Sequence, residues 1–433
     1  MKIFQYPSRA AEKKLSIIEN RSIGFRKKDV TSVARIIQDV KKNGDEALLN
    51  YTRQFDAPGL KKSTLKVSEK EMAAAQKQVD RAFVRALNRA ARQVKHFHRQ
   101  QRPSSWINVE RPGALLGQIV RPVDTAGIYV PGGKEGKTPL VSTVLMCAIP
   151  AGIAGVQRIC MVTPPMRNGK VDPHLLVAAQ KARVHEVYKV GSAWAVAALA
   201  YGTPTIPKAN VIVGPGNIYV TLAKKLVAGE VGIDMIAGPS EVLIIADKTA
   251  NPAYIAADLL SQAEHDPLAS AVLVTTSPKV ASQVSAALDS QLAALARRET
   301  AAASLNRFGA IMVVPDLATA IDFANRIAPE HLVVQVKDPL SHISAIRNAG
   351  AIFLGEFTPE PVGDYVAGPN HVLPTAGTAR YASALSVDHF TKKSSLIQYS
   401  RDAFQKEAKD IVRLAEVEGL GAHANAVRIR LKT

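Results

Sequence analysis

The chain has 433 residues, of which 47% are hydrophobic and only 5% aromatic, and its net charge is +18. This length is sufficient for two to four domains with cores of their own. The most apolar run, Val141 to Val156, is interrupted by Pro150 and Gly152 and is shorter than the ~20 residues that a membrane-spanning helix needs. Because the N-terminal stretch lacks an apolar signal core, a cytoplasmic protein without a membrane partner is expected.

The positive charge is concentrated in the first third of the chain. Residues 1–130 contain 26 Lys and Arg against 12 Asp and Glu, and basic residues recur at helical spacing from Lys77 to Arg99. Such a face is usually solvated, and His96 and His98 on it are expected at the surface. The segment has no C2H2, RNP or helix-turn-helix signature and few aromatic residues for base stacking, so no specific nucleic-acid partner is expected. A basic nucleic-acid-binding protein stays a remote alternative, which predicts salt-dependent oligonucleotide binding.

The two cysteines, Cys147 and Cys160, both lie inside apolar sequence. The pattern favours buried, inert thiols without a disulfide. A catalytic cysteine is the alternative for an aldehyde oxidation, but neither residue lies beside a His or at a Gly-rich turn.

The N-terminal part predicts long helices and the remainder predicts α/β structure. One helix is expected from Asp29 to a stop at Gly44, and a second over 69–101, before Pro103. Later segments of helical length alternate with short β-rich runs, which indicates βαβ units and parallel sheets covered by helices. The strand-like runs are Gly127–Val130, Arg158–Val162, Glu186–Val190, Val211–Val213, Val242–Ile245, Ala271–Thr275, Ala310–Val314 and Leu332–Val336.

The predicted fold class is therefore α/β, with two Rossmann-like parallel-sheet domains and small helical segments at both ends. Ligands of such sheets bind at the carboxyl ends of strands, where Gly132-Gly133 and the Gly214-Pro215-Gly216-Asn217 loop are expected. No standard G-x-G-x-x-G is present, because the run from Gly214 has Tyr219 at the third glycine. The expected divisions are an N-terminal segment 1–28, a discontinuous first domain 29–124 and 241–384, a second domain 125–240 and a helical C-terminal tail 385–433.

A possible chelating pair closes a helix that Asn251 is expected to cap, with Pro252 at its first position. Gln262 and His265 are three residues apart, so their side chains share one face of the last turn and can converge on one ion. Alone this pattern is weak, because Gln is an uncommon zinc ligand and a lone His often caps a helix.

Four later segments add His or acidic residues in loop-like sequence. They are Ala328-Pro329-Glu330-His331-Leu332, Pro361-Val362-Gly363-Asp364-Tyr365, Gly368-Pro369-Asn370-His371 and Glu418-Gly419-Leu420-Gly421-Ala422-His423. Taken singly, Asp364 would read as a turn cap and His423 as the end of a surface helix. In this order, together with residues 214–217 and 237–241, the motifs closely resemble the histidinol dehydrogenase family. The resemblance extends from about residue 25 to the C-terminus.

The resemblance implies a set of site residues. It implies one zinc ion per subunit on Gln262, His265, Asp364 and His423. It implies that His331 is the base for the alcohol and that Glu330 activates the water that hydrates the aldehyde. The implied substrate contacts are Ser240, Gln262, His265, His331, Asp364, His371, Glu418 and His423. The implied NAD contacts are Tyr129, Asn217 and Trp194, and at Trp194 the family has a Gln. An indole can stack on a base but cannot replace both hydrogen-bonding roles of the amide.

The implied activity is a zinc-dependent, NAD-linked four-electron oxidation of L-histidinol, through L-histidinal, to L-histidine, the last step of histidine biosynthesis. The first domain would carry most of the zinc and catalytic residues and the second would bind NAD. The tail 385–433 would complete the site of the partner in a homodimer. The main alternative is a dehydrogenase of the same fold for another amino- or sulfo-alcohol. Ser240, His371 and Glu418, which match substrate contacts of the histidinol enzymes, argue against it.

Overall fold

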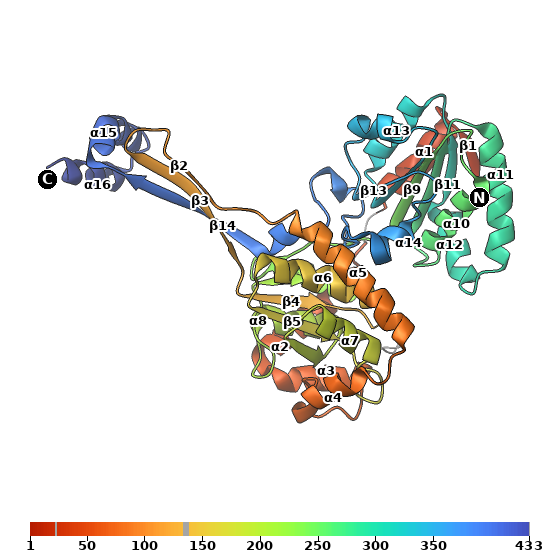
Figure 1. Cartoon of the computed structure of the whole chain (residues 1–433), viewed down its shortest axis with the longest axis horizontal. Coiled ribbons are helices and arrows are strands. Elements are labelled where there is room, and N and C mark those ends of the chain that lie inside the picture. The colour runs from red at the N-terminus through yellow and green to blue at the C-terminus, as the bar shows by residue number, and fades with distance from the viewer. Residues whose placement is uncertain (22–23, 133–137, 433) are drawn as a thin grey trace. The chain divides into compact units, whose positions relative to one another are not determined.

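The computed structural model describes residues 1–21, 24–132 and 138–432. The chain forms two compact units, the first from residues 1–101 and 123–390 and the second from residues 102–122 and 391–433 (Figure 1). The first unit contains two parallel sheets covered by helices, and the second contains an antiparallel sheet and two helices. Over the described ranges, every helix is too short or too polar to cross a bilayer.

The first parallel sheet has five strands in the order β6-β5-β4-β7-β8. Its strands are β4 (Thr125–Tyr129), β5 (Arg158–Thr163), β6 (Glu186–Lys189), β7 (Val211–Val213) and β8 (Gly232–Ile233). One face packs on α4 (Glu69–Ala75), α5 (Arg81–Arg99), α6 (Val141–Ala154) and α7 (Pro173–Lys181). The other packs on α2 (Lys27–Asn43), α3 (Asp45–Phe55), α8 (Ser192–Tyr201) and α9 (Ile218–Val227).

The second parallel sheet has six strands in the order β1-β11-β10-β9-β12-β13. Its strands are β1 (Ile3–Gln5), β9 (Glu241–Ala246), β10 (Ser270–Thr275), β11 (Ala310–Val313), β12 (His331–Gln335) and β13 (Ala351–Leu354). One face packs on α10 (Pro252–Ala263), α11 (Pro278–Ala293) and α12 (Arg298–Phe308), and the other on α1 (Arg9–Glu19) and α13 (Leu317–Ile327).

The two parallel sheets share one winding. Numbered from β4 or from β9, each has the strand order 3-2-1-4-5, and the second sheet adds β1 at its edge. This doubly wound order reverses direction between β4 and β7 in one sheet and between β9 and β12 in the other. The predicted α/β class and all eight predicted strands are confirmed, because each expected run overlaps one of these strands.

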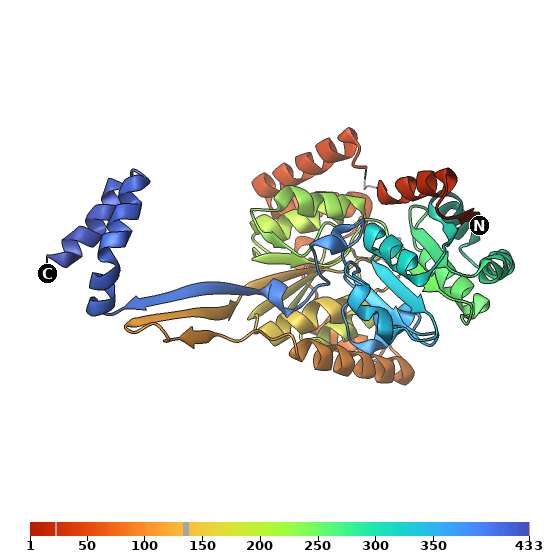
Figure 2. The same ribbon diagram turned by 90° about the horizontal axis from the view of Figure 1, so that it is seen from above.

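The C-terminal tail differs from the expected helical segment. It begins with a nine-residue strand, β14 (Thr391–Tyr399), which pairs antiparallel with β3 (Ala114–Pro122) along its whole length (Figure 2). The short β2 (Trp106–Asn108) adds to β3, and α15 (Arg401–Val417) and α16 (Gly421–Leu431) follow. The sequence pattern missed β14 because most of its side chains are polar and at least partly exposed, so no buried face imposes a period of two.

The packing also differs from the expected domain divisions. Residues 29–124 were expected to share a domain with residues 241–384, but α2, α3, α4 and α5, within residues 27–99, pack on the five-stranded sheet. The N-terminal segment is part of the six-stranded sheet, since β1 pairs with β11 and α1 covers one face. Amphipathic spacing shows that a helix has a buried face, but it does not show which sheet that face meets.

The expected helix over 69–101 is interrupted. It divides into α4 and α5, because the Asp80 side chain accepts the Phe83 N–H and caps a new helix. The surface position predicted for His98 is wrong, since this side chain is fully buried. Its Nδ1–H donates to the Val94 carbonyl (2.8 Å), and Asn370 donates to its Nε2 (3.2 Å). Both hydrogen bonds compensate the imidazole for the loss of water.

Candidate active site

Helix α10 positions the predicted chelating pair. The Asn251 side chain accepts the Ala253 N–H and Pro252 is the first helical residue, as the sequence predicted. Because α10 runs back across the sheet after β9, its last turn lies at the amino ends of the strands. Gln262 in this turn is 1% exposed, whereas His265, just beyond the helix end, is exposed. The negative end of the helix dipole favours a cation at this point.

Glu330 and His331 lie at the amino end of β12, opposite the start of β9. The pair therefore follows α13 and precedes β12, at the edge of the sheet opposite to the carboxyl ends of the strands. Ala328 adopts a left-handed conformation (φ 53°) and Pro329 follows it, so the chain bends before the strand begins. This bend lets two adjacent side chains approach each other, with Glu330 Oε2 3.7 Å from His331 Nδ1. Both residues are buried.

The tautomer of His331 is fixed by the start of β9. Its Nδ1 lies 3.0 Å from the main-chain carbonyl of Glu241, so Nδ1–H donates to that oxygen and the lone pair is on Nε2. Burial lowers the pKa of His331 to about 4. The imidazole is therefore neutral near pH 7, and its Nε2 can accept a proton.

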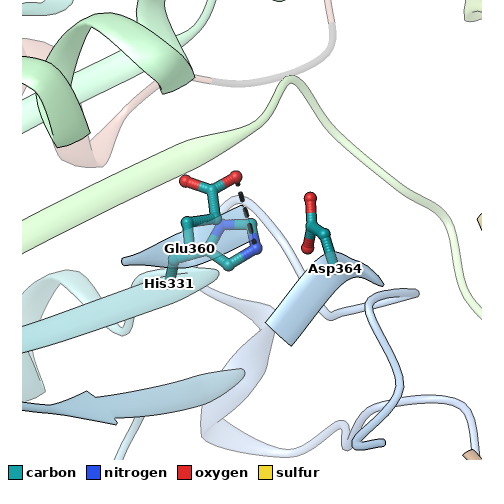
Figure 3. Close-up of side chains that lie close together, drawn as sticks. All are labelled: His331, Glu360 and Asp364. Carbon is teal, nitrogen blue, oxygen red and sulfur yellow. Dashed lines mark ion pairs between the residues drawn. The ribbon is translucent and has the colours of Figure 1, made fainter. Parts of the chain in front are cut away.

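Two further carboxyl groups face this imidazole. The short helix α14 (Glu360–Val362) continues into a π-helical turn (Gly363–Ala367), which puts Glu360 and Asp364 on one face. Potential ligand atoms of His331, Glu360 and Asp364 all lie within 4.8 Å of one another, and Figure 3 shows the three side chains converging. Nε2 of His331 is 3.7 Å from Glu360 Oε1.

Within the part of the chain that the structure describes, these carboxyl groups lack an ion pair with Lys or Arg that would offset their burial. Among the described residues, neither Glu360 nor Asp364 forms an ion pair with a Lys or Arg. Burial raises the pKa of Asp364 to about 6 and that of Glu360 well above its ordinary value. A cation placed here would offset that desolvation and favour the ionised forms.

Gln262 joins this cluster through its amide. With the nitrogen turned inward, it donates to Glu360 Oε2 (3.0 Å) and to the Glu241 carbonyl (3.1 Å), which keeps the amide oxygen available for a cation. Of the four predicted zinc ligands, the structure thus brings together Gln262 and Asp364. Among the described residues, His265 is not part of any group of three His, Cys, Asp or Glu residues whose potential ligand atoms lie within 4.8 Å of one another. His423 belongs to the second unit, where its side chain is exposed.

The other predicted substrate residues lie in both units of the chain. Ser240 immediately precedes β9 and is half-buried. His371 lies with its Nε2 3.1 Å from the Ser142 hydroxyl, and burial lowers the pKa of His371 to about 4. A cavity of about 350 Å³ is lined by both Asp364 and His371. Glu418 caps α15 in the second unit and is exposed.

Sequence reasoning did not select Glu360 or the role of Glu241. Two signals were present. Glu360 is four residues before Asp364, which is one helical turn, and Glu241 opens a strand whose other residues are all apolar and buried. An acidic residue in such a strand needs a buried partner. The sequence therefore indicates that Glu241 has a buried partner, although it does not show which residue that is.

The residues predicted to contact NAD lie at the other sheet. Tyr129 ends β4, and Asn217 caps α9 after β7, so they flank the point where the five-stranded sheet reverses direction. Tyr129 is 3% exposed and its hydroxyl accepts the Ser192 N–H (3.1 Å), whereas Asn217 is exposed. Gly133, also expected in this region, lies outside the described residues.

The loop between β7 and α9 is held by a buried ion pair. Asp234 accepts the Gly214 N–H (2.7 Å), Lys224 donates to the Gly214 carbonyl (3.0 Å), and the two side chains bond to each other. Gly214 has φ 114°, and a Cβ there would lie 2.2 Å from the Tyr129 carbonyl oxygen. The loop therefore packs directly on β4 and requires glycine at this position.

Trp194 is packed into the core of the five-stranded domain. Its side chain is 4% exposed, its ring stacks on Tyr51 and Phe55, and its N–H donates to the Thr52 hydroxyl (3.1 Å). The indole therefore faces α3, and its single polar group is already bonded. This placement indicates that the Trp194 ring contributes to the packing of the core.

Two doubly wound sheets, one of which carries a buried imidazole and carboxyl groups at its edge, are typical of an α/β enzyme. A sequence profile described as histidinol dehydrogenase matches residues 20–431. The chain is 55% identical to histidinol dehydrogenase of Desulfotalea psychrophila over 93% of both chains. It is 51% identical to that of Carboxydothermus hydrogenoformans over 92% of this chain and 93% of the relative. The crystal structure of histidinol dehydrogenase from Elizabethkingia anophelis superposes with a TM-score of 0.93 at 38% identity, covering 100% of this chain and 98% of that one. The chain belongs to the histidinol dehydrogenase family and is an oxidoreductase.

The packing of Trp194 predicts that replacing it with the Gln typical of the family reduces stability more than cofactor binding. We expect Trp194→Gln to lower the free energy of unfolding by about 3 kcal/mol, since a buried aromatic contact is lost. The KM for NAD should change less than about threefold, because the ring faces α3. Urea unfolding and initial rates at varied NAD measure the two effects.

Trp194→Phe is the matched control, because it keeps an aromatic ring in the stack while it removes the N–H to Thr52 and part of the ring volume. It should lose less stability than Trp194→Gln. A Trp194→Gln variant with unchanged stability and a strongly altered KM for NAD would instead show that the indole is part of the cofactor site.

Proposed function

We propose that this protein oxidises L-histidinol through L-histidinal to L-histidine, the last step of histidine biosynthesis. The observation that carries the proposal is the fixed, neutral tautomer of His331, whose free Nε2 faces the buried Glu360 and the half-buried Asp364 in a chain of this family. A neutral imidazole in that position is suited to accept the proton of an alcohol.

The donor set fits a divalent cation. Glu360 and Asp364 are acidic groups without a Lys or Arg partner in the described chain, Gln262 offers an amide oxygen, and α10 ends at the same point. We propose that Gln262, His265 and Asp364, with His423 of a second copy, hold one zinc ion. Nitrogen and oxygen donors of this kind suit zinc and leave room for substrate atoms.

Zinc and NAD are the two proposed cofactors. When bound, zinc would hold the imidazole and amino nitrogens of the substrate, and NAD, bound near Tyr129 and Asn217, would accept the hydride. Ser240, His371 and Glu418 would complete the substrate contacts. The exposed Asn217 beside the Gly214 loop, at the carboxyl ends of β4 and β7, supports a nucleotide there.

The two acid-base groups have separate tasks in this proposal. His331 takes the proton of the alcohol as the first hydride leaves, which gives the aldehyde. Glu330 takes a proton from the water that adds to the aldehyde, and the hydrate loses the second hydride to become the acid. Burial raises the pKa of Glu330 well above its ordinary value, which makes its carboxylate a stronger base. Overall, the alcohol, one water and two NAD+ give the carboxylate, two NADH and three protons.

A second copy of the chain is the proposed partner. The second unit exposes large apolar side chains, several more than half accessible: Trp106, Ile107, Val109, Ile397, Leu414, Val417 and Ile429. Single exposed apolar residues are normal, but a concentration of them in one small unit indicates a covered surface. We propose that this unit docks on the partner and supplies Glu418 and His423 to its site, so that the active sites of the dimer are shared.

The proposed reaction predicts the NADH yield from limiting L-histidinol. We expect two NADH per substrate with zinc-loaded enzyme and none after chelation, with recovery on adding zinc. Glu330→Gln should give about one NADH and release histidinal, because hydration lacks its base. His331→Asn should slow the alcohol step at least about a hundredfold while zinc content stays unchanged.

Each alternative has its own signature in this assay. No NADH from the loaded wild-type enzyme would point to a different alcohol, and a panel of amino- and sulfo-alcohols would then identify the substrate. An unchanged second step in Glu330→Gln would reject the water-activating role, and normal turnover of His331→Asn would reject the base.

The metal ligands can be separated from the carboxyl groups that merely adjoin them. We expect Asp364→Asn and His265→Ala to lose bound zinc. Glu360→Gln should keep it, because Glu360 is 3% exposed and accepts from the Gln262 amide. Zinc per chain after exhaustive dialysis is the measurement.

Asp258→Asn is the matched control, since Asp258 is another buried carboxyl on α10 but bonds to Gln335 (2.9 Å). Its zinc content should stay normal. Zinc loss in Glu360→Gln with retention in His265→Ala would assign the ion to the His331, Glu360 and Asp364 group instead.

Shared active sites predict complementation between inactive variants. Asp364→Asn and His423→Ala would each inactivate both sites of a homodimer. After subunit exchange in an equal mixture, half of the dimers are mixed and each has one intact site, so activity should recover to about a quarter of wild type. Mixing Asp364→Asn with His331→Asn is the control, because both changes lie in the first unit. No recovery in the first mixture, after exchange is verified by mass, would mean that each site is formed by one chain.

A further inference from the structure

Glu241 contacts the proposed catalytic residues through its own peptide groups. It is the first residue of β9 and is 7% exposed. Its N–H donates to the Glu330 carboxylate (2.9 Å), and its carbonyl accepts from His331 Nδ1 (3.0 Å). The same carbonyl accepts from the Gln262 amide (3.1 Å). One residue therefore orients both acid-base side chains and one proposed metal ligand.

The side-chain carboxylate of Glu241 accepts hydrogen bonds from two main-chain N–H groups and from Arg21. Its Oε2 accepts the Glu330 N–H (3.2 Å), so residues 241 and 330 each bond the other's peptide group with a carboxylate. Its Oε1 accepts the Ala376 N–H (3.1 Å) and bonds to Arg21 (2.5 Å). The carboxylate thus joins the start of β12 to the turn at residue 376.

Arg21 supplies the charge that this buried carboxylate requires. Its side chain is 3% exposed and comes from the N-terminal segment after α1. The guanidinium also donates to the carbonyls of Leu268 (3.1 Å) and Pro239 (3.0 Å). Because these bonds fix the guanidinium from several sides, Arg21 holds Glu241 in position as well as neutralising it.

Glu330 depends on this contact more than His331 does. His331 is part of β12, where the strand pairs with β9 and β13 hold its main chain. Glu330 precedes the strand in a bend, and its N–H bonds only to the Glu241 carboxylate among the described residues. Loss of the Arg21–Glu241 pair would therefore release Glu330 first.

We propose that Arg21 and Glu241 are positioning residues for the second oxidation, which hold the Glu330 carboxylate where it receives a proton from the attacking water. This inference rests on the proposed function. In that step the water oxygen bonds to the aldehyde carbon, one water proton passes to Glu330, and the carbonyl oxygen carries the negative charge of the hydrate. Loss of a hydride from the hydrate anion, which bound NAD would accept, then gives the acid.

The test compares Arg21→Met with Lys189→Met. The two cationic side chains are each 3% exposed and each bond to a carboxylate at 2.5 Å, but Lys189 bonds to Glu71 on the five-stranded domain. We expect Arg21→Met to oxidise added histidinal at least about tenfold more slowly, while histidinol oxidation with an aldehyde trap slows less than about threefold. Its NADH yield should fall from two toward one, with histidinal released. Lys189→Met should keep both steps in their wild-type ratio.

Arg21→Lys separates position from charge and serves if Arg21→Met does not fold. The Lys side chain keeps the positive charge but not the several N–H donors of the guanidinium. Its rate of histidinal oxidation should therefore lie between those of wild type and Arg21→Met. Hydrogen exchange of the peptide over residues 328–331 should quicken in the Arg21 variants and not in Lys189→Met.

The outcomes separate this inference from the proposed function. A normal ratio of the two steps in both Arg21 variants overturns the positioning role. A wild-type yield below two NADH overturns the proposed four-electron reaction instead. In that case the exchange measurement still decides whether Arg21 and Glu241 hold Glu330, and unchanged exchange would reject it.

Discussion

The burial of several carboxyl groups against one guanidinium is the constraint on which the arrangement of this site depends. Glu241, Glu330 and Glu360 are all buried at the amino edge of one sheet, and among the described residues Arg21 forms an ion pair with Glu241. Removing carboxylates from water is costly unless donors or cations replace the water. Peptide N–H groups and Arg21 meet this need around Glu241, whereas Glu360 and Asp364 have no Lys or Arg ion-pair partner among the described residues.

This constraint explains why the cluster occupies the less usual edge of a doubly wound sheet. The carboxyl ends of strands suit nucleotides because helix amino termini follow them and favour phosphate. The amino ends are where helices finish, and α10 presents the negative end of its dipole there. A cation and an ammonium-bearing substrate suit that edge. In the proposed function, the nucleotide would therefore bind at one sheet and the substrate at the other.

The sequence was sufficient for much of this arrangement. Alternation of β-rich and helical segments predicted eight strands, and Asn251-Pro252 fixed the start of α10. The family motifs selected Glu330, His331 and Asp364, which lie together. Glu360 and Arg21 were missed because their importance comes from burial, and burial depends on contacts distant in sequence. The strand β14 was missed because a two-sided, polar ribbon has no apolar period to detect.

Trp194 shows how far a single departure from a family pattern can be interpreted. Comparison of residue types alone suggested an altered cofactor site, because an indole cannot make the hydrogen bonds of an amide. In the fold, the ring stacks on Tyr51 and Phe55, and its N–H donates to Thr52. Both the aromatic face and the polar group of the indole therefore have partners inside the protein. A residue at a family's binding position contributes to binding only if its backbone directs it there. Here the ring packs against the aromatic side chains of α3, and the difference from the family pattern at this position is explained by packing.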